Sequence, residues 1–376
     1  MRRHHVVIAI LLVAATAACG DNDEGGGLPD ASTAEVCQPP AGEAPWFDLD
    51  QEPCRDLSSY RFFTDGRAQL ASDGVVPYDV NSALFSDYAS KHRFLFLPAP
   101  MAYKGSGVFD LPVGSVLIKT FAYRGDLRDP ESDEKLVETR LLVHGEEGWH
   151  GLVYVWDDGQ SDAQLQVSGG IVPVEWIDAE GDEQALQYIV PNINQCENCH
   201  VADDSARPIG IQARHLNRDY AYPEGSANQL VALTERGLLT GAPADPADAP
   251  RAAVWDDPDS GTVEERTRAW LDINCAHCHS PTGPARTSGL DLRVEQLEPA
   301  LYGVCKTPVA AGAGSGGRQY GIVPGKPDES ILVFRLESVE PAIRMPEILR
   351  QTVHRESLAL IRQWVSSLEG ECAPPE

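Results

Sequence analysis

The spacing of hydrophobic and polar side chains over residues 45–190 predicts β-strands. Residues 115–123 (SVLIKTFAY) are rich in β-branched and aromatic side chains. Residues 136–143 (LVETRLLV) alternate in a way that puts every second side chain on one face of a strand. Residues 149–156 (WHGLVYVW) predict a further strand after a Gly-Glu-Glu-Gly turn. We therefore expect residues 45–190 to form a β-rich domain, either a β-sandwich or a barrel-like fold.

The pattern becomes helical near the C-terminus. Thr262 and Glu265 have the spacing of a capping box, which predicts a helix that continues to Cys275. Residues 355–368 carry apolar side chains at helical intervals and end before a glycine. Pro327 precedes a third helical segment. These signals predict a small α-helical domain over residues 261–372.

Residues 191–260 differ from both flanking segments. They contain many turn residues and no period-two runs, although residues 228–238 have the pattern of one helix. We interpret 191–260 as a loop-rich module that ends in a linker. The predicted fold class is an α+β multidomain protein: a β-rich N-terminal domain, a loop-rich module and a small α-helical domain.

Two Cys-x-x-Cys-His motifs carry the candidate chemistry, one in each of the last two modules. Two cysteines three positions apart present both sulfurs on one turn, where each forms a thioether to a haem vinyl group, and the following histidine ligates the iron. The alternative is a Cys₄ zinc ribbon, which needs neither histidine. We expect two covalently bound c-type haems, held by Cys196, Cys199 and His200 and by Cys275, Cys278 and His279.

The N-terminus has the layout of an export signal. Two arginines precede an apolar run, and Thr16-Ala-Ala-Cys19 resembles a bacterial lipobox, in which Cys19 is lipidated after cleavage. The alternative is an ordinary cleavage site near Cys19. Residues 20–44 begin with a polar, glycine-rich tether, and Gly20 favours sorting to the outer membrane. We expect residues 1–19 to be a lipoprotein signal peptide and the protein to face the periplasm or the cell surface.

The remaining cysteines fit an oxidising compartment. Apart from Cys19 and the haem motifs, the chain has four cysteines, an even number. Three pairings are open, and proximity along the chain favours Cys37 with Cys54 and Cys305 with Cys372. Free buried thiols are the alternative.

The net charge of the chain indicates which classes of partner it can bind. The formal net charge is −27 over 376 residues, which argues against nucleic acid and anionic lipid surfaces. It is compatible with a basic redox partner protein. After the N-terminal run no apolar stretch approaches the length of a membrane span, so we expect membrane contact only through the lipid anchor.

The chain resembles a family of exported bacterial dihaem c-type cytochromes of unestablished physiological role. The resemblance covers about residues 75–370 and implies two covalent haems and a β-rich N-terminal domain, without naming a substrate. The last module alone is similar to monohaem cytochrome c domains. The resemblance therefore completes the predicted fold class: a β-rich N-terminal domain, a loop-rich haem module and a small α-helical cytochrome c domain. The segments that carry the resemblance are 77–88 (PYDVNSALFSDY), 109–123 (FDLPVGSVLIKTFAY), 138–142 (ETRLL), 154–165 (YVWDDGQSDAQL), 191–200 (PNINQCENCH), 208–210 (PIG), 271–292 (LDINCAHCHSPTGPARTSGLDL) and 322–330 (IVPGKPDES).

Elimination reduces the number of residues that could be the second axial ligand of each haem iron. Met345 stands in an Arg-Met-Pro-Glu segment before the last helix, where small cytochromes c commonly place a methionine ligand, and we assign it to the second haem. A buried, gap-filling methionine is the alternative. Pro284 is expected to offer a carbonyl to the His279 ring. For the first haem the preferred candidate is His215; an open sixth position and the other candidates remain, namely Met101, His92, His144, His150, His277 and His354.

Two functions follow from these expectations. In the first, both haems are six-coordinate and the protein carries electrons. In the second, the first haem is open and the protein is a redox enzyme, peroxidase-like or of another class, with no catalytic residue identified.

Overall fold

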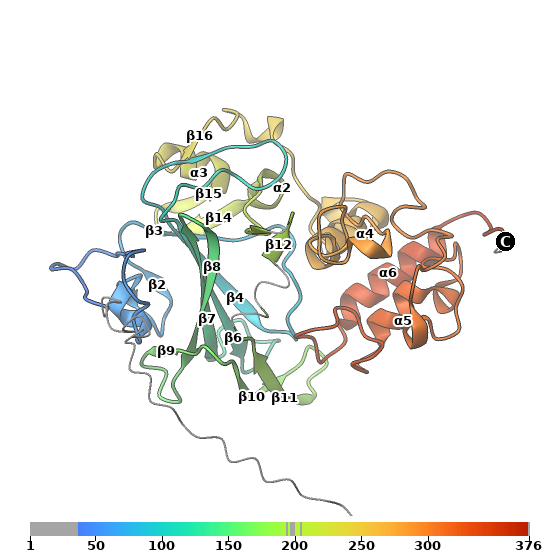
Figure 1. Ribbon diagram of the computed structural model, residues 1–376, viewed down its shortest axis with the longest axis horizontal. Helices are drawn as coiled ribbons and strands as arrows, with labels where there is room; N and C mark the ends of the chain where they lie inside the picture. Colours follow the sequence, from blue (N-terminus) through green and yellow to red (C-terminus); the bar gives the residue numbers. More distant parts are fainter. Residues whose placement is uncertain (1–36, 193–194, 196–199, 204, 375–376) are drawn as a thin grey trace, which may run out of the picture.

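The computed structural model describes residues 37–374, with the exception of 193–194, 196–199 and 204. Figure 1 shows a twisted sheet beside a cluster of C-terminal helices, with a short hairpin between them. The six strands of the main sheet are β3 (Val75–Tyr78), β4 (Ser90–Phe96), β6 (Val116–Arg124), β7 (Glu134–Gly145), β8 (Gly148–Trp156) and β9 (Ala163–Leu165).

The main sheet is an antiparallel meander with the strand order β3-β4-β6-β7-β8-β9, so each strand pairs with the sheet strand that follows it in the chain. The three strands that the sequence predicted are confirmed as β6, β7 and β8. The sandwich or barrel expectation is wrong for the described residues, because the sheet is open and its second layer is the hairpin of β10 (Gly170–Ile177) and β11 (Glu183–Val190). A period-two pattern shows that one face of a strand is buried, but it does not show which element covers that face.

The remaining strands are short. They form two-stranded sheets at the periphery and between the larger units. They are β1 (Phe63–Asp65), β2 (Leu70–Ala71), β5 (Met101–Ala102), β12 (Val201–Ala202), β13 (Ser205–Ala206), β14 (Asp219–Tyr222), β15 (Gly225–Asn228) and β16 (Leu239–Thr240).

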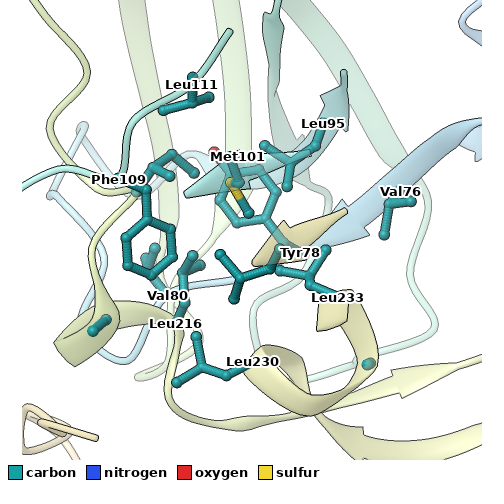
Figure 2. Packing of buried hydrophobic residues seen from close by; sticks show 14 of the residues in the cluster. Val76, Tyr78, Val80, Leu95, Met101, Phe109, Leu111, Leu216, Leu230 and Leu233 are labelled. Atoms are coloured by element: carbon teal, nitrogen blue, oxygen red, sulfur yellow. The ribbon is translucent and has the colours of Figure 1, made fainter. Parts of the chain in front are cut away.

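One end of the sheet is covered by residues that follow the first haem motif. Helices α2 (Ala213–Leu216) and α3 (Gln229–Glu235) pack their leucines against the sheet. Met101 lies at the centre of this cluster with no exposed surface, and Figure 2 shows its thioether among Tyr78, Leu95 and Leu233. The module that follows residue 190 is therefore packed onto the sheet and shares a core with it.

Three helices and a long irregular segment form the C-terminal part. Helix α4 (Val263–Leu271) begins with the capping box of Thr262 and Glu265 that the sequence predicted, and a π-helical turn, η4 (Asp272–Ala276), extends it to Cys275. Helices α5 (Ile331–Glu337) and α6 (Arg355–Ser367) follow. Trp270, Ile361 and Trp364 meet in their shared core.

The predicted fold class is wrong in its last part, because a small α-helical cytochrome c domain is not shown. Over the residues that the structure describes, the protein is β-rich, with 27% strand, 20% helix and five α-helices. Among the described residues no α-helix lies between Ala276 and Ile331; turns and single 3₁₀ turns fill that segment. Its many glycines and prolines favour turns, whereas the local signals that predicted α4 and α6 carry no information about the chain between them.

The short 3₁₀ turns complete the element list. They are η1 (Leu57–Tyr60), η2 (Pro246–Asp248), η3 (Pro258–Ser260), η5 (Arg286–Ser288), η6 (Gly312–Ser315) and η7 (Pro327–Glu329).

Two disulfides close loops at opposite ends of the described chain. Cys37 is bonded to Cys54, and Cys305 is bonded to Cys372. These are the two pairs that proximity along the chain favoured. Within the residues that the structure describes, no helix has the length and apolarity needed to cross a bilayer.

The sheet and the C-terminal part are joined by hydrogen bonds to one loop of the β-rich region. The Asp87 carboxylate accepts the backbone N–H groups of Gln351 and Thr352 at 2.9 and 2.7 Å. The Phe85 N–H donates a hydrogen bond to the Asn274 side chain at 2.7 Å. Asn274 directly precedes Cys275 in the chain. Because Asp87 is buried, these bonds fix the second Cys-x-x-Cys-His motif relative to the sheet.

Candidate functional site

The second Cys-x-x-Cys-His motif leaves helix α4 through the π-turn η4. The His279 N–H donates to the Cys275 carbonyl at 2.8 Å, so that the motif closes as one compact turn. Gly283 crosses above this turn so closely that an added Cβ would lie 2.3 Å from the Cys278 carbonyl oxygen. A residue with a side chain cannot occupy this position without displacing the motif backbone.

The protonation of the His279 ring follows from its neighbours. Its Nδ1 lies 3.0 Å from the Ser288 hydroxyl, and that hydroxyl donates its only proton to the Ala285 carbonyl at 2.8 Å. The Ser288 oxygen can therefore only accept, so Nδ1 carries the ring proton and Nε2 keeps its lone pair. Ser288, and not Pro284 as the sequence suggested, is the hydrogen-bond partner of this ring. Burial, followed by the charge of Arg335, lowers the pKa of His279 and keeps the ring neutral.

A cavity of about 450 Å³ opens in front of this motif. Cys275, Cys278 and His279 form one part of its wall, and Met345 belongs to the same wall. Most of the other lining side chains are apolar, among them Leu292, Ile322 and Leu336. Burial raises the pKa of the Cys275 thiol to about 12, so the thiol is neutral at pH 7.

The cavity fits a c-type haem. It supplies two thiols at the motif spacing, a neutral imidazole with a free Nε2 lone pair, a thioether and an apolar wall of ligand-binding size. Metal-ligating histidines commonly donate their other ring N–H to a neighbouring acceptor, as His279 does to Ser288. Met345 is thus brought to the second motif, whereas Met101 belongs to the core near the sheet.

The first motif is described only from His200 onward, because Cys196 and Cys199 lie outside the described residues. The Nδ1 of His200 lies 2.9 Å from the Arg207 carbonyl, which can only accept. The proton is therefore on Nδ1, and Nε2 again keeps its lone pair. Burial lowers the pKa of His200 to about 4, and the charges of Lys119 and Arg140 add to this effect.

The loops that follow the two motif histidines, His200 and His279, lie side by side. The Asp203 N–H donates to the Thr282 carbonyl at 3.1 Å, and the Arg207 guanidinium donates to the Thr282 hydroxyl at 3.2 Å. Asp203 and Arg207 follow His200 in the chain, and Thr282 follows His279. Two direct bonds therefore join the loops that carry the two histidines.

The His215 ring contacts the Asp272 carboxylate and is not free to act as an axial ligand. Its ring is buried at 1% exposure, and its Nε2 lies 3.5 Å from the Asp272 carboxylate. Asp272 also binds Arg214 at 3.0 Å. Burial opposes ionisation of Asp272, but the hydrogen bond to His215 and the charge of Arg214 lower its pKa. His215 thus belongs to an ion-pair group at the start of the π-turn η4.

Most of the other candidates for the first haem are engaged elsewhere. Their contacts are with carboxylates, carbonyls or aromatic rings of the surrounding fold, except for one exposed side chain. His92 pairs with Glu134, and His144 binds the Leu111 carbonyl and stacks on Trp149. His354 accepts a hydrogen bond from the Trp270 side chain and stacks on Phe85. His150 is exposed, and Met101 is buried in the core.

His277 is the exception. It stands inside the second motif and lines the cavity. Its Nδ1 is buried and has no hydrogen-bond partner among the described residues. Burial lowers the pKa of His277 to about 4, and the charges of His200 and His279 add to this effect, whereas a hydrogen bond to the Ile273 backbone opposes it.

Sequence reasoning missed Ser288 and Arg207 as the partners of the two histidines. Each stands within ten residues of its histidine, but neither lies at a spacing that a regular helix or strand would bring together. Among the residues that the structure describes there is no group of three or more metal-ligating side chains; a Cys₄ zinc site would also need Cys196 and Cys199, which are not described.

The geometry above stands without support from relatives. No protein family, no curated protein and no solved structure matches this chain.

Proposed function

We propose that the protein is an exported dihaem c-type cytochrome that transfers electrons. The proposal rests on the fact that the two motif histidines have the same protonation and the same kind of hydrogen bond. His200 and His279 each hold the ring proton on Nδ1 through a fixed acceptor, and each keeps a free lone pair on Nε2. A pair of neutral, oriented imidazoles, each directly after a Cys-x-x-Cys sequence, is what c-type haem attachment requires.

A haem supplies one-electron exchange at its iron, and the chain's own residues set the conditions for it. Ser288 and the Arg207 carbonyl fix the orientation of the two rings. The thioether of Met345 is a soft donor in an apolar wall, which favours reduced iron over oxidised iron. The bonds between the two motif loops support transfer between the two centres, because they hold the loops in contact.

We propose His277 as the second axial ligand at the first haem. The other candidates are engaged or exposed, whereas the buried Nδ1 of His277 has no hydrogen-bond partner among the described residues. In addition, the loop that follows the second motif is hydrogen-bonded to the loop that follows His200. With Met345 at the second haem, both centres are then six-coordinate and the protein is an electron carrier. In the alternative, a redox enzyme, the first centre keeps an open position.

The proposed location and partners rest on sequence. The lipobox-like segment ending at Cys19 and the following tether support export and lipid anchoring, with the folded part facing the periplasm or the cell surface. The net charge of −27 supports a basic redox protein as partner and argues against nucleic acid. The two disulfides are consistent with an oxidising compartment.

Mass spectrometry of the intact protein tests the proposal. After expression with a working haem-attachment system, we expect a mass increase of two haems that survives denaturation and acid–acetone extraction. The variant Cys275→Ser/Cys278→Ser should carry one haem, and the control Cys305→Ser/Cys372→Ser should still carry two. A wild-type mass with bound zinc, or with no cofactor, contradicts the proposal.

A further inference from the structure

The cavity at the second motif has three charged side chains in its wall. Lys306 and Arg335 are cations, and Glu347 is the only carboxylate among the described residues that line the cavity. The two histidines of the wall, His277 and His279, both have lowered pKa values and are neutral at pH 7. The wall therefore has one positive charge more than it has negative charges.

The charge of Arg335 is balanced by other groups of the protein. Its guanidinium lies 3.5 Å from the Glu347 carboxylate, and its Nε donates to the Ile343 carbonyl at 2.8 Å. An added Cβ at Gly314 would lie 3.2 Å from the guanidinium carbon, so the glycine-rich turn packs closely on this side chain. The excess positive charge of the wall therefore belongs to Lys306.

The Lys306 ammonium has no ion-pair or hydrogen-bond partner among the residues that the structure describes. The Lys306 backbone, in contrast, is firmly held. Its carbonyl accepts the Gly321 N–H at 2.8 Å, and the preceding residue, Cys305, is bonded to Cys372. The fold thus fixes a lysine in the cavity wall without supplying an anion for it.

The ammonium lies beside the turn that orients the His279 ring. An added Cβ at Gly289 would lie 3.2 Å from the Lys306 Nζ. Gly289 directly follows Ser288, whose oxygen accepts the hydrogen bond from Nδ1 of His279. The unpaired cation is therefore at the part of the wall that carries the proposed iron ligand of the second haem.

Lys306 stands where the cavity opens to solvent. Val309 and Ala310, which follow it in the chain, line the cavity and are exposed, and Lys306 itself is partly exposed. Leu292 and Ile322 of the inner wall are only 4% and 1% exposed. A charged group at the opening keeps part of its hydration, so an anion binds there without the full cost of burial.

We propose that Lys306 binds the propionates of the haem held by His279. A haem has an apolar macrocycle with its carboxylates at one edge, and the cavity has the complementary layout of an apolar inner wall and one unbalanced cation at the opening. Lysine binds a carboxylate through charge-assisted hydrogen bonds. This inference rests on the proposed function, because its occupant is the second haem. A soluble amphipathic carboxylate, such as a fatty acid, has the same chemistry, and the experiment distinguishes the two sources.

The experiment compares the wild-type holoprotein with Lys306→Gln, Lys306→Arg and the control Lys326→Gln. Lys326 is an exposed lysine of the same C-terminal part, and its ammonium pairs with Glu329 at 3.2 Å. Three quantities are measured for each form: haem number by intact mass, the two reduction potentials, and the binding of octanoate by calorimetry. The potential that is absent from the variant Cys275→Ser/Cys278→Ser identifies the second haem.

Removal of the cation should stabilise oxidised iron at the second haem. A unit charge about 10 Å from the iron, at an effective dielectric constant of about 20, changes a one-electron equilibrium roughly tenfold, equivalent to ~59 mV. In Lys306→Gln we expect two bound haems, an unchanged first potential and a second potential that is lower by about this amount. Lys306→Arg, which keeps the charge, should restore the second potential, Lys326→Gln should leave both potentials unchanged, and no form should bind octanoate.

The haem number of Lys306→Gln is informative as well. If this variant carries one haem while the wild type and Lys306→Arg carry two, the proposal is also supported, because a cation is then needed to seat the second haem. If Lys306→Gln and Lys306→Arg lower the second potential equally, packing and not charge causes the change, and the proposal is wrong.

Three further outcomes decide against the proposal. If all forms carry two haems with equal potentials and bind no octanoate, Lys306 is not a carboxylate site. If the wild type binds octanoate and Lys306→Gln does not, with unchanged potentials, the occupant is a soluble carboxylate and the propionate assignment is overturned. If the wild-type mass shows no haem at the second motif, the proposed function fails and the occupant assignment fails with it; octanoate binding then decides separately whether Lys306 binds carboxylates.

Discussion

The His279 ring and the Ser288 hydroxyl form a one-way hydrogen bond in which the ring must donate. The Ser288 hydroxyl donates its proton to the Ala285 carbonyl, so its oxygen accepts a hydrogen bond from Nδ1 of His279 at 3.0 Å. The ring is therefore oriented before any metal binds, and its Nε2 is available as a ligand.

Replacement of Ser288 should alter the second haem without removing it. In Ser288→Ala the Nδ1 proton loses its acceptor, so the imidazole becomes a weaker donor and the potential of that haem should rise. Loss of the bond should also lower the free energy of unfolding by about 1 kcal/mol. Redox titration and chemical denaturation measure both effects, and Ser288→Thr, which keeps a hydroxyl, should recover most of the potential. A potential that does not move in Ser288→Ala would show that this bond does not tune the iron ligand.

Met345 and Met101 provide a matched pair for the thioether assignment. Met345 lines the cavity of the second motif, whereas Met101 is fully buried in the core shown in Figure 2. Met345→His should lower one of the two potentials, since His/His coordination favours oxidised iron more than His/Met does. It should also abolish the weak thioether-to-iron band in the red part of the oxidised spectrum. Met101→Leu should leave the spectrum and both potentials unchanged and cost less than about 1.5 kcal/mol of stability.

The same pair can reject the assignment. Equal spectra and potentials for wild type and Met345→His would return Met345 to a packing role.

His277 decides between electron carrier and enzyme. If His277 fills the sixth position of the first haem, reduced wild-type protein should not bind carbon monoxide, and His277→Phe should bind it at one haem. The exposed His150 provides the control, because His150→Phe should behave as wild type. Absorption difference spectra with stoichiometric carbon monoxide measure the result. Binding by the wild type at one haem would instead support an open first centre and the redox-enzyme alternative.

His354 should make the fold sensitive to mild acid. Burial, followed by the charge of Lys91, lowers the pKa of His354 to about 3, whereas the unfolded chain has an ordinary histidine pKa of about 6.5. The unfolded state thus binds more protons between these values, so this contribution to stability is complete above pH 6.5 and is lost as the pH falls towards 3. The loss from this one group is at most about 1.4 kcal/mol per pH unit.

Urea denaturation at pH 7 and pH 5 measures this effect. His354→Gln should reduce the difference in unfolding free energy between the two pH values. Its stability at pH 7 should fall by about 1 kcal/mol, because the stacking on Phe85 is lost. Substitution of the exposed His150 by Gln should leave the pH difference intact. An identical pH difference in wild type and His354→Gln would show that another group causes the acid sensitivity.

Cys19 tests the anchoring proposal independently of the haem sites. Cys19→Ser should move the protein from the membrane fraction to the soluble fraction, because the lipid would be the only membrane attachment. Both haems should remain, since the tether precedes the folded part of the chain. Fractionation without detergent, followed by intact mass, measures both properties. Wild-type protein that is soluble without detergent would contradict lipidation.

The sequence alone determined the features that depend on near neighbours in the chain. The apolar runs predicted β6, β7 and β8, the Thr262–Glu265 spacing predicted the start of α4, and amphipathic spacing predicted α6. These patterns are readable because a strand or a helix repeats every two or 3.6 residues, and a cap depends on positions three apart. The Cys-x-x-Cys-His motifs are local in the same sense.

Only the tertiary structure decided how these pieces meet. The expected helical cytochrome c domain was wrong, because helix signals do not show that the chain between helices forms turns. His215, preferred by its distance along the chain from His200, is committed to Asp272. Strand register alone brings Arg93, Lys119 and Arg140 side by side from three strands. Register and side-chain partners are set by packing across the sheet, and a one-residue shift would move each of these cations to the opposite face.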